Sequence, residues 1–349
     1  MTRSCNAIWA LGCIRHRGGN RMTRSDAVLI TAIVGAILSF SFISSGGNVG
    51  SFGITILSGL FQGMLLFLVA AGLSLIFGLM DVLNFAQGAY FMVGAYLAYD
   101  IQHTGGLIDV GIADPGLRFI VGVIAATLAG AVLGVLLELL LRPVYKRHLF
   151  LLVLTFGVSI VMLEGIKAFY SVTPYTWTEF FGIREAQFTF LGQNFTQYRL
   201  FVLAVGFALM VGISLLLNRT RIGIIIRAGV QDREMVSALG INVQTVFTFV
   251  FTLGCAVAAF GGAIAAPFLG ATITMGTTYL VAAIAVIVLG GLGSYEGTAI
   301  GAMIVGLALA AMQQFSITIN QPVLASITPM MLLIAVLLIR PRGLFGQER

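Results

Sequence analysis

Long apolar runs dominate this sequence and limit what it can fold into. A helix needs about 20 apolar residues to cross a bilayer. Long runs lie near 29–47, 54–80, 118–141, 150–170, 199–217, 244–269 and 323–340, and shorter ones near 84–100, 279–292 and 297–315. Hydrophobic residues make up 59% of the chain and charged residues 9%, against about 25% charge in soluble domains. The sequence therefore predicts an all-α, polytopic membrane protein with about eight to ten transmembrane segments in one domain.

The basic residues are grouped in the short connections between these runs. The groups are Arg15, Arg17, Arg21 and Arg24; Arg142, Lys146 and Arg147; Arg219, Arg221, Arg227 and Arg233; and Arg340 with Arg342. Cytoplasmic loops carry an excess of Lys and Arg. Ten crossings with a cytoplasmic N-terminus place every group on the cytoplasmic face. The net charge of +6 therefore reports membrane topology rather than affinity for nucleic acid.

These positions divide the chain into three parts. We expect a cytoplasmic tail over 1–28, a transmembrane domain over 29–340 that includes a cytoplasmic loop at 219–243, and a cytoplasmic tail over 341–349. The sequence Met1-Thr-Arg-Ser4 recurs as Met22-Thr-Arg-Ser25, so Met22 is an alternative start of translation.

Polar residues interrupt the apolar sequence between 72 and 88. Ser74, Gly78, Asp81, Asn84 and Gln87 recur every three or four residues, which places them on one stripe of a helix. An Asp near the bilayer centre costs about 2.5 to 3.5 kcal/mol, so such a stripe is tolerated only against protein or a hydrated cavity. The stripe predicts a solute path lined by Ser74, Asp81, Asn84 and Gln87.

A second interrupted segment lies in the other half of the chain. Gly293, Gly297 and Gly301 form two overlapping GxxxG steps, which favour close helix packing. Interrupted apolar segments in the two halves of a chain are typical of transporters with internal repeats. The two segments are not similar enough in sequence to establish a repeat.

Two loops carry further signals. Between 219 and 243, residues Asp232 to Leu239 can form about two helical turns that Gly240 ends, which suits docking to a cytoplasmic partner. The loop 171–198 alternates aromatic and polar residues, as in Gln187-Phe-Thr-Phe190, and predicts a small hairpin at the membrane interface.

Several chemistries have no support in the sequence. A phosphate-binding loop requires Gly-Lys, and the only lysines follow Tyr145 and Ile166. The histidines lie in loops or in the tail, at 16, 103 and 148, so no buried serine has a histidine base on a span, and metal ligation by His and Cys has no support for the same reason. We expect no cofactor and no metal, and any ATP must be used by another subunit. Two acids have structural partners at helical spacing, in the pairs Glu138 with Arg142 and Glu164 with Lys167.

Taken together, residues 55–346 resemble the permease subunits of branched-chain amino-acid ABC importers, the LivH type. The most specific parts are Gly72 to Gly78 running into Asn84 to Gly88, Arg142-Pro143, Arg227 to Asn242, Gly290 to Gly301, and Arg340 to Gly346. The resemblance implies a non-enzymatic subunit of the bacterial inner membrane. Its partners would be a second related permease, two ATP-binding subunits and a periplasmic binding protein. The cytoplasmic loop would be the coupling helix, through Arg227, Asp232, Glu234, Ser237, Ala238 and Gly240.

Two positions depart from the family pattern, and two alternatives stay open. The position of Asp81 is commonly glycine in the family, and that of Gln87 commonly histidine, so the solute is not fixed by the resemblance. The same architecture carrying urea or short amides is one alternative. The other is a self-sufficient channel or ion-driven carrier, with Asp81 and Glu164 as the ion-coupling acids. A carrier has no need of a docking loop, which favours the importer.

Overall fold

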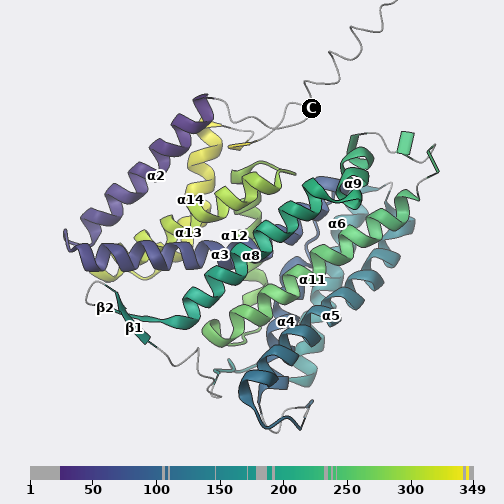
Figure 1. Cartoon of the computed structure of the whole chain (residues 1–349), viewed down its shortest axis with the longest axis horizontal. Helices are drawn as coiled ribbons and strands as arrows, with labels where there is room; N and C mark the ends of the chain where they lie inside the picture. Colours follow the sequence, from purple (N-terminus) through teal and green to yellow (C-terminus); the bar gives the residue numbers. More distant parts are fainter. Residues whose placement is uncertain are drawn as a thin grey trace, which may run out of the picture.

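The computed structural model describes residues 24–103, 107–108, 111–145, 147–170, 172–177, 187–190, 193–231, 235–236, 239–240, 242–340 and 343–345. Over these residues the chain forms a bundle of ten long helices (Figure 1). They are α2 (Arg24–Ser44), α3 (Val49–Met80), α4 (Gln87–Gln102), α5 (Pro115–Leu141), α6 (His148–Phe169), α8 (Gln197–Arg219), α11 (Val243–Leu269), α12 (Met275–Gly290), α13 (Tyr295–Thr318) and α14 (Val323–Ile339). The shorter elements are η1 (Arg142–Val144), α9 (Arg221–Gln231), β1 (Gln187–Phe190) and β2 (Gln193–Thr196).

The helices differ in whether they are long enough to cross a bilayer. Six of them, α3, α5, α6, α8, α11 and α13, are long and apolar enough to cross a membrane, and α2, α12 and α14 hold shorter apolar stretches. The prediction of a polytopic, helical membrane protein is confirmed. The hairpin predicted within 171–198 is also confirmed, because β1 and β2 pair antiparallel with Phe188 opposite Phe195.

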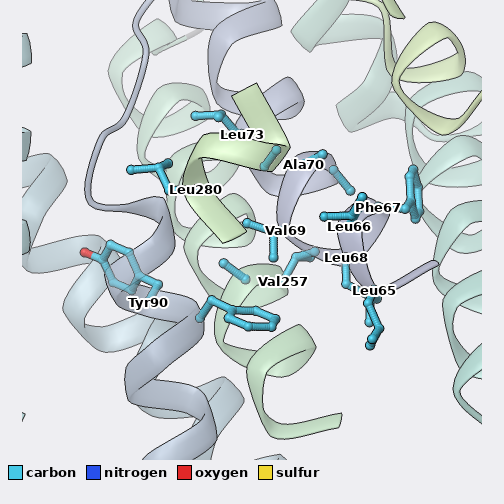
Figure 2. Close-up of a cluster of buried hydrophobic side chains, with 14 of the residues drawn as sticks. Leu65, Leu66, Phe67, Leu68, Val69, Ala70, Leu73, Tyr90, Val257 and Leu280 are labelled. Carbon is cyan, nitrogen blue, oxygen red and sulfur yellow. The ribbon is translucent and has the colours of Figure 1, made fainter. Parts of the chain in front are cut away.

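Helices α3 and α11 form the centre of the bundle. Every residue from Leu65 to Ala71 is buried, so α3 is covered on all sides rather than on one face. Figure 2 shows this run of α3 with Tyr90 of α4, Val257 of α11 and Leu280 of α12 around it. The outer helices instead expose aliphatic residues on one side, as α5 does with Ile124, Leu128 and Val132. That pattern is typical of a lipid-facing helix.

Glycines allow the central helices to approach closely. A Cβ on Gly306 of α13 would overlap the backbone at Gly59 and Gly63 of α3, and one on Gly262 of α11 would overlap the backbone at Phe91 of α4. Small residues at such crossings let van der Waals contact replace the hydrophobic effect, which does not drive association inside lipid. These glycines of the central helices are therefore packing residues of the core.

The helix contacts follow one pattern twice. Helix α3 packs on α13, and in the same way α11 packs on α5. Helix α4 packs on α11 and on α6, and in the same way α12 packs on α3 and on α14. The unit α3 to α6 therefore corresponds to the unit α11 to α14. The break between α3 and α4 at 81–86 corresponds to the break between α11 and α12 at 270–274. From the sequence, the glycine segment 290–301 was the expected counterpart of 72–88, because both segments interrupt apolar runs. The helix contacts instead make 270–274 the counterpart.

Candidate functional site

The predicted polar stripe does not lie on one helix. Helix α3 ends at Met80, Asp81 adopts a left-handed conformation with φ 56° and ψ 31°, and α4 begins at Gln87. Asp and Asn tolerate this conformation better than other non-glycine residues because their short polar side chains bond locally. The polar stripe expected over 72–88 is therefore divided between two helices, and the interruption of this apolar segment is a break in the helix.

Two amide side chains fill the break between α3 and α4. The Gln87 Nε2 donates to the carbonyl oxygen of Gly254 at 2.9 Å, and the Asn84 Nδ2 lies 3.4 Å from the Gln87 Oε1. The Asn84 Oδ1 accepts the backbone N–H of Ala86 at 3.1 Å. Asn84 and Gln87 have no exposed surface, and buried amides are stable only when they are paired. Gly72 leaves the space, because a Cβ there would overlap the Gln87 amide.

The first turns of α4 and α12 meet inside the bundle. A Cβ on Gly88 would overlap the carbonyl group of Gly276, one residue into α12. The side chain of Gln87 reaches Gly254, which lies near the middle of the membrane-spanning helix α11. Two helices thus begin at membrane depth. Discontinuous helices of this kind mark the solute site of many transporters.

Ser74 connects α3 to α13. The Thr298 hydroxyl donates to the Ser74 Oγ at 2.9 Å, and both residues are buried. Asp81 differs from the other three residues of the predicted path, because it lies exposed at the end of α3. The structure brings Asn84 and Gln87 together, places Ser74 on a separate contact, and leaves Asp81 apart. That these four residues line a solute path stays a prediction.

The glycine segment forms the turn between α12 and α13. Gly293 has φ 82°, and a Cβ on Gly78 would lie 3.2 Å from its carbonyl oxygen. Gly297 is so close to Gly290 that a Cβ would overlap its carbonyl group, and a Cβ on Gly301 would lie 2.8 Å from the Val286 oxygen. The end of α3 therefore lies against this turn.

The loop 219–243 is described in part. Helix α9 follows α8 directly and contains Arg227, and Gly240 has φ 80°, a conformation that favours glycine. Four of the predicted coupling residues, Asp232, Glu234, Ser237 and Ala238, lie outside the described residues. Two apolar residues that neighbour these positions in the sequence, Met235 and Leu239, are 60% and 72% exposed. Helix α9 packs on α8, α3 and α11.

An ion pair lies at the end of α5. The Arg142 Nε lies 3.1 Å from both carboxylate oxygens of Glu138, the Tyr145 hydroxyl donates to the same carboxylate, and the Arg142 Nη2 donates to Thr248 of α11. Glu138 is fully buried. The predicted pairing of Glu138 with Arg142 is confirmed, and so is that of Glu164 with Lys167 at 2.7 Å.

Tyr175, in the described part of the segment after α6, pairs with the second break. Tyr175 and Ala271 exchange two backbone hydrogen bonds of 2.9 Å, and the Tyr175 ring packs against Tyr99 of α4. Burial, and then the nearby Asp100 carboxylate, raise the pKa of the Tyr170 phenol above its ordinary value. Tyr170 is therefore neutral at physiological pH.

One polar face of α3 was not predicted from the sequence. Spacings of four, three and four residues separate Ser51, Thr55, Ser58 and Gln62 along the first half of α3. Their spacing was visible in the sequence, but serine and threonine are too common in membrane helices to stand out. Within the described residues no group of three or more His, Cys, Asp or Glu side chains could hold a metal ion.

The fold and the two breaks define a class. This is a multi-pass helical membrane protein built from two corresponding units, each with a helix that begins at membrane depth, which is an architecture of transporters. Residues 55–337 match the model of the family described as branched-chain amino acid transport system / permease component. The chain belongs to this family.

Curated relatives agree with the family. The probable branched-chain amino acid transport permease protein LivH of Methanocaldococcus jannaschii is 29% identical over 296 residues, 81% of this chain and 89% of that protein. The high-affinity permease protein LivH of Salmonella typhimurium is 29% identical over 80% of this chain and 91% of its own length. The high-affinity permease protein BraD of Pseudomonas aeruginosa is 29% identical over 84% and 95%. No solved structure matches the chain.

Proposed function

We propose that this chain is the permease subunit of an ATP-binding-cassette importer and forms half of a path for branched-chain or related amino acids across the bacterial inner membrane. The observation that carries the proposal is the family match over 55–337, which spans both units of the bundle and both breaks. The curated relatives are named as branched-chain amino acid permeases. The permease itself performs no catalysis and holds no cofactor.

The partners follow from this role. Two ATP-binding subunits act from the cytoplasm, a binding protein delivers the solute from the periplasm, and a second related permease completes the path. Both chain termini then lie in the cytoplasm, with the transmembrane domain at 29–340 between the tails 1–28 and 341–349. The loop 219–243 contacts the ATPases through Arg227, Asp232, Glu234, Ser237, Ala238 and Gly240.

The breaks give the path its means of movement. Asn84 and Gln87 join α4 to α11, and Ser74 joins α3 to α13. When ATP binding closes the ATPases, the loop shifts the helices that these contacts connect, and the path changes its open side. Asp81 lies exposed where α3 ends, on a connection that such a movement must bend.

Uptake of radiolabelled leucine tests the proposal, with urea and a basic amino acid as comparators. Vesicles hold this chain with or without the ATPases, the second permease and the binding protein. We expect leucine uptake only with the partners and ATP. Uptake of urea alone selects the architecture that carries urea or short amides. Uptake by the chain alone supports a carrier or channel, in which Asp81 and Glu164 couple ions, although Glu164 already pairs with Lys167.

A further inference from the structure

Residues of three helices form a polar face in the outer part of the bundle. We name as the outer polar face Ser51, Thr55, Ser58 and Gln62 of α3, Arg199 of α8 and Gln313 of α13. Spacings of four, three and four place the α3 residues on one side of that helix. Below Gln62 the same side continues as Leu65 and Val69, both buried in the core. The polar face thus occupies the first half of α3 and stops inside the bundle.

An exposed pair of amides distinguishes this face from the lipid-facing sides. The Gln62 Nε2 donates to the Gln313 Oε1 at 2.5 Å, and Gln313 is exposed. This bond leaves the Oε1 of Gln62 and the Nε2 of Gln313 for other partners. Amides that face hydrocarbon have no solvent to bond with, and they are therefore expected against protein or water. The contrast with the aliphatic side of α5 indicates that lipid tails do not cover the outer polar face.

Arg199 is a cation that contacts aromatic rings and a serine hydroxyl. Its guanidinium lies 4.7 Å from the ring centre of Phe268, 5.0 Å from that of Phe195 and 5.6 Å from that of Phe61. The Nη1 donates to the Ser58 Oγ at 3.2 Å, and the Nε is buried with no acceptor. Within the described residues no carboxylate forms an ion pair with Arg199.

Such a cation is costly unless an anion pairs with it, and among the described residues no carboxylate does so. Aromatic rings contribute about 0.5 to 2 kcal/mol each to a cation, which is less than the several kcal/mol that desolvating a charge can cost. The side chain is only partly buried, so an anion can reach it. The first turn of α8, in which Arg199 lies, adds the positive end of a helix dipole.

We propose that the outer polar face lines the periplasmic part of the solute path and that Arg199 receives the carboxylate of a passing amino acid. The Gln62 oxygen can accept a hydrogen bond from the ammonium group, and the ring of Phe268, which is 40% exposed, offers apolar surface to an aliphatic side chain. The inference rests on the proposed function and narrows it to zwitterionic solutes, because urea and short amides carry no carboxylate for Arg199.

Cysteine labelling in the full complex tests this face without any transport. Cys5 and Cys13 are replaced by serine, and the buried Cys255 stays. Ser58→Cys and Gln62→Cys are exposed in vesicles to thiosulfonate reagents that cannot cross the membrane, one anionic and one cationic. Phe207→Cys is the control, because Phe207 is 56% exposed on the same helix as Arg199 and is expected to face lipid.

We expect both cysteines on α3 to react at least about tenfold faster than the control, with a preference for the anionic reagent. Adding Arg199→Gln removes the preference, and Arg199→Lys keeps it. Rates no higher than that of the control overturn the proposal, because lipid or another subunit then covers the face. An unchanged preference with Arg199→Gln overturns the role of the arginine.

Wild-type uptake separates this inference from the proposed function. Leucine uptake by a complex whose α3 cysteines do not react overturns only the outer polar face. Reactive cysteines in a complex that takes up urea but not leucine support a water-filled face and overturn its assignment to amino acids. In an active complex, saturating leucine is expected to slow labelling of Gln62→Cys by the anionic reagent, and no slowing counts against binding of the carboxylate there.

Discussion

Gln87 donates its side-chain amide to the carbonyl oxygen of Gly254 at 2.9 Å, so that the first turn of α4 is tied to the middle of α11. The donor is the side chain of the first residue of α4, and the acceptor is a backbone carbonyl in the interior of α11. The bond is possible only because Gly72 leaves room beside it. It joins the break of the first unit to the central helix of the second.

Gln87→Leu should destabilise the protein by about 1 to 3 kcal/mol, because the Gly254 carbonyl oxygen loses a donor and the Asn84 amide loses an acceptor at a buried site. Asn84→Leu should act in the same direction and impair uptake while the complex still assembles. The thermal midpoint of the purified protein and the rate of leucine uptake measure the two effects. Ser39→Ala, at an exposed serine of α2, is the control. Normal uptake by both leucine variants would show that the network only packs.

Gly88→Ala should disrupt the contact between the first turns of α4 and α12. The added methyl group would overlap the Gly276 carbonyl, and overpacking of this kind costs about 1 to 3 kcal/mol. Gly157→Ala is the matched control, because a Cβ at that position of α6 meets nothing within 4 Å. The control should be neutral or slightly stabilising, since alanine favours helices. Equal midpoints for the two variants would contradict the close approach.

Removing Arg142 should cost more than removing the pair. Arg142→Met leaves the fully buried Glu138 carboxylate without its cation, at a cost of about 3 to 5 kcal/mol. The double variant Glu138→Met with Arg142→Met should recover much of that loss, because no buried charge remains. A double-mutant cycle on thermal or chemical unfolding gives the coupling. If the effects of the two single substitutions simply add, the ion pair does not stabilise the end of α5.

Glu234→Arg should uncouple ATP hydrolysis from uptake if the loop after α9 docks on the ATPases. Reversing the charge changes the docking surface while the spans still insert. Glu234→Asp, which keeps the acid, is the control. Parallel assays of the ATPase rate and of leucine uptake in the complex give the ratio of leucine taken up to ATP hydrolysed. Wild-type uptake by the arginine variant would remove the coupling assignment.

The sequence by itself determined the class and the lengths of the elements. Ten apolar runs became ten helices because each run must pair its backbone within itself in lipid, and this requirement is local. The ion pairs Glu138–Arg142 and Glu164–Lys167 were predictable for the same reason, since each spans one turn of a helix. The motifs between 55 and 346 also pointed to the family.

Only the tertiary structure decided how these helices meet. Periodicity placed Ser74, Asn84 and Gln87 on one stripe, but the partners that fix them, Thr298 and Gly254, lie more than 150 residues away. The break at 81–86 could not be separated from a bent helix by spacing alone, and its counterpart at 270–274 carries no similar sequence. Arg199 shows the same limit, because the three rings around it come from segments that only packing brings together. Local hydrogen bonding is encoded along the chain, whereas contacts between helices depend on shapes that meet only in the folded bundle.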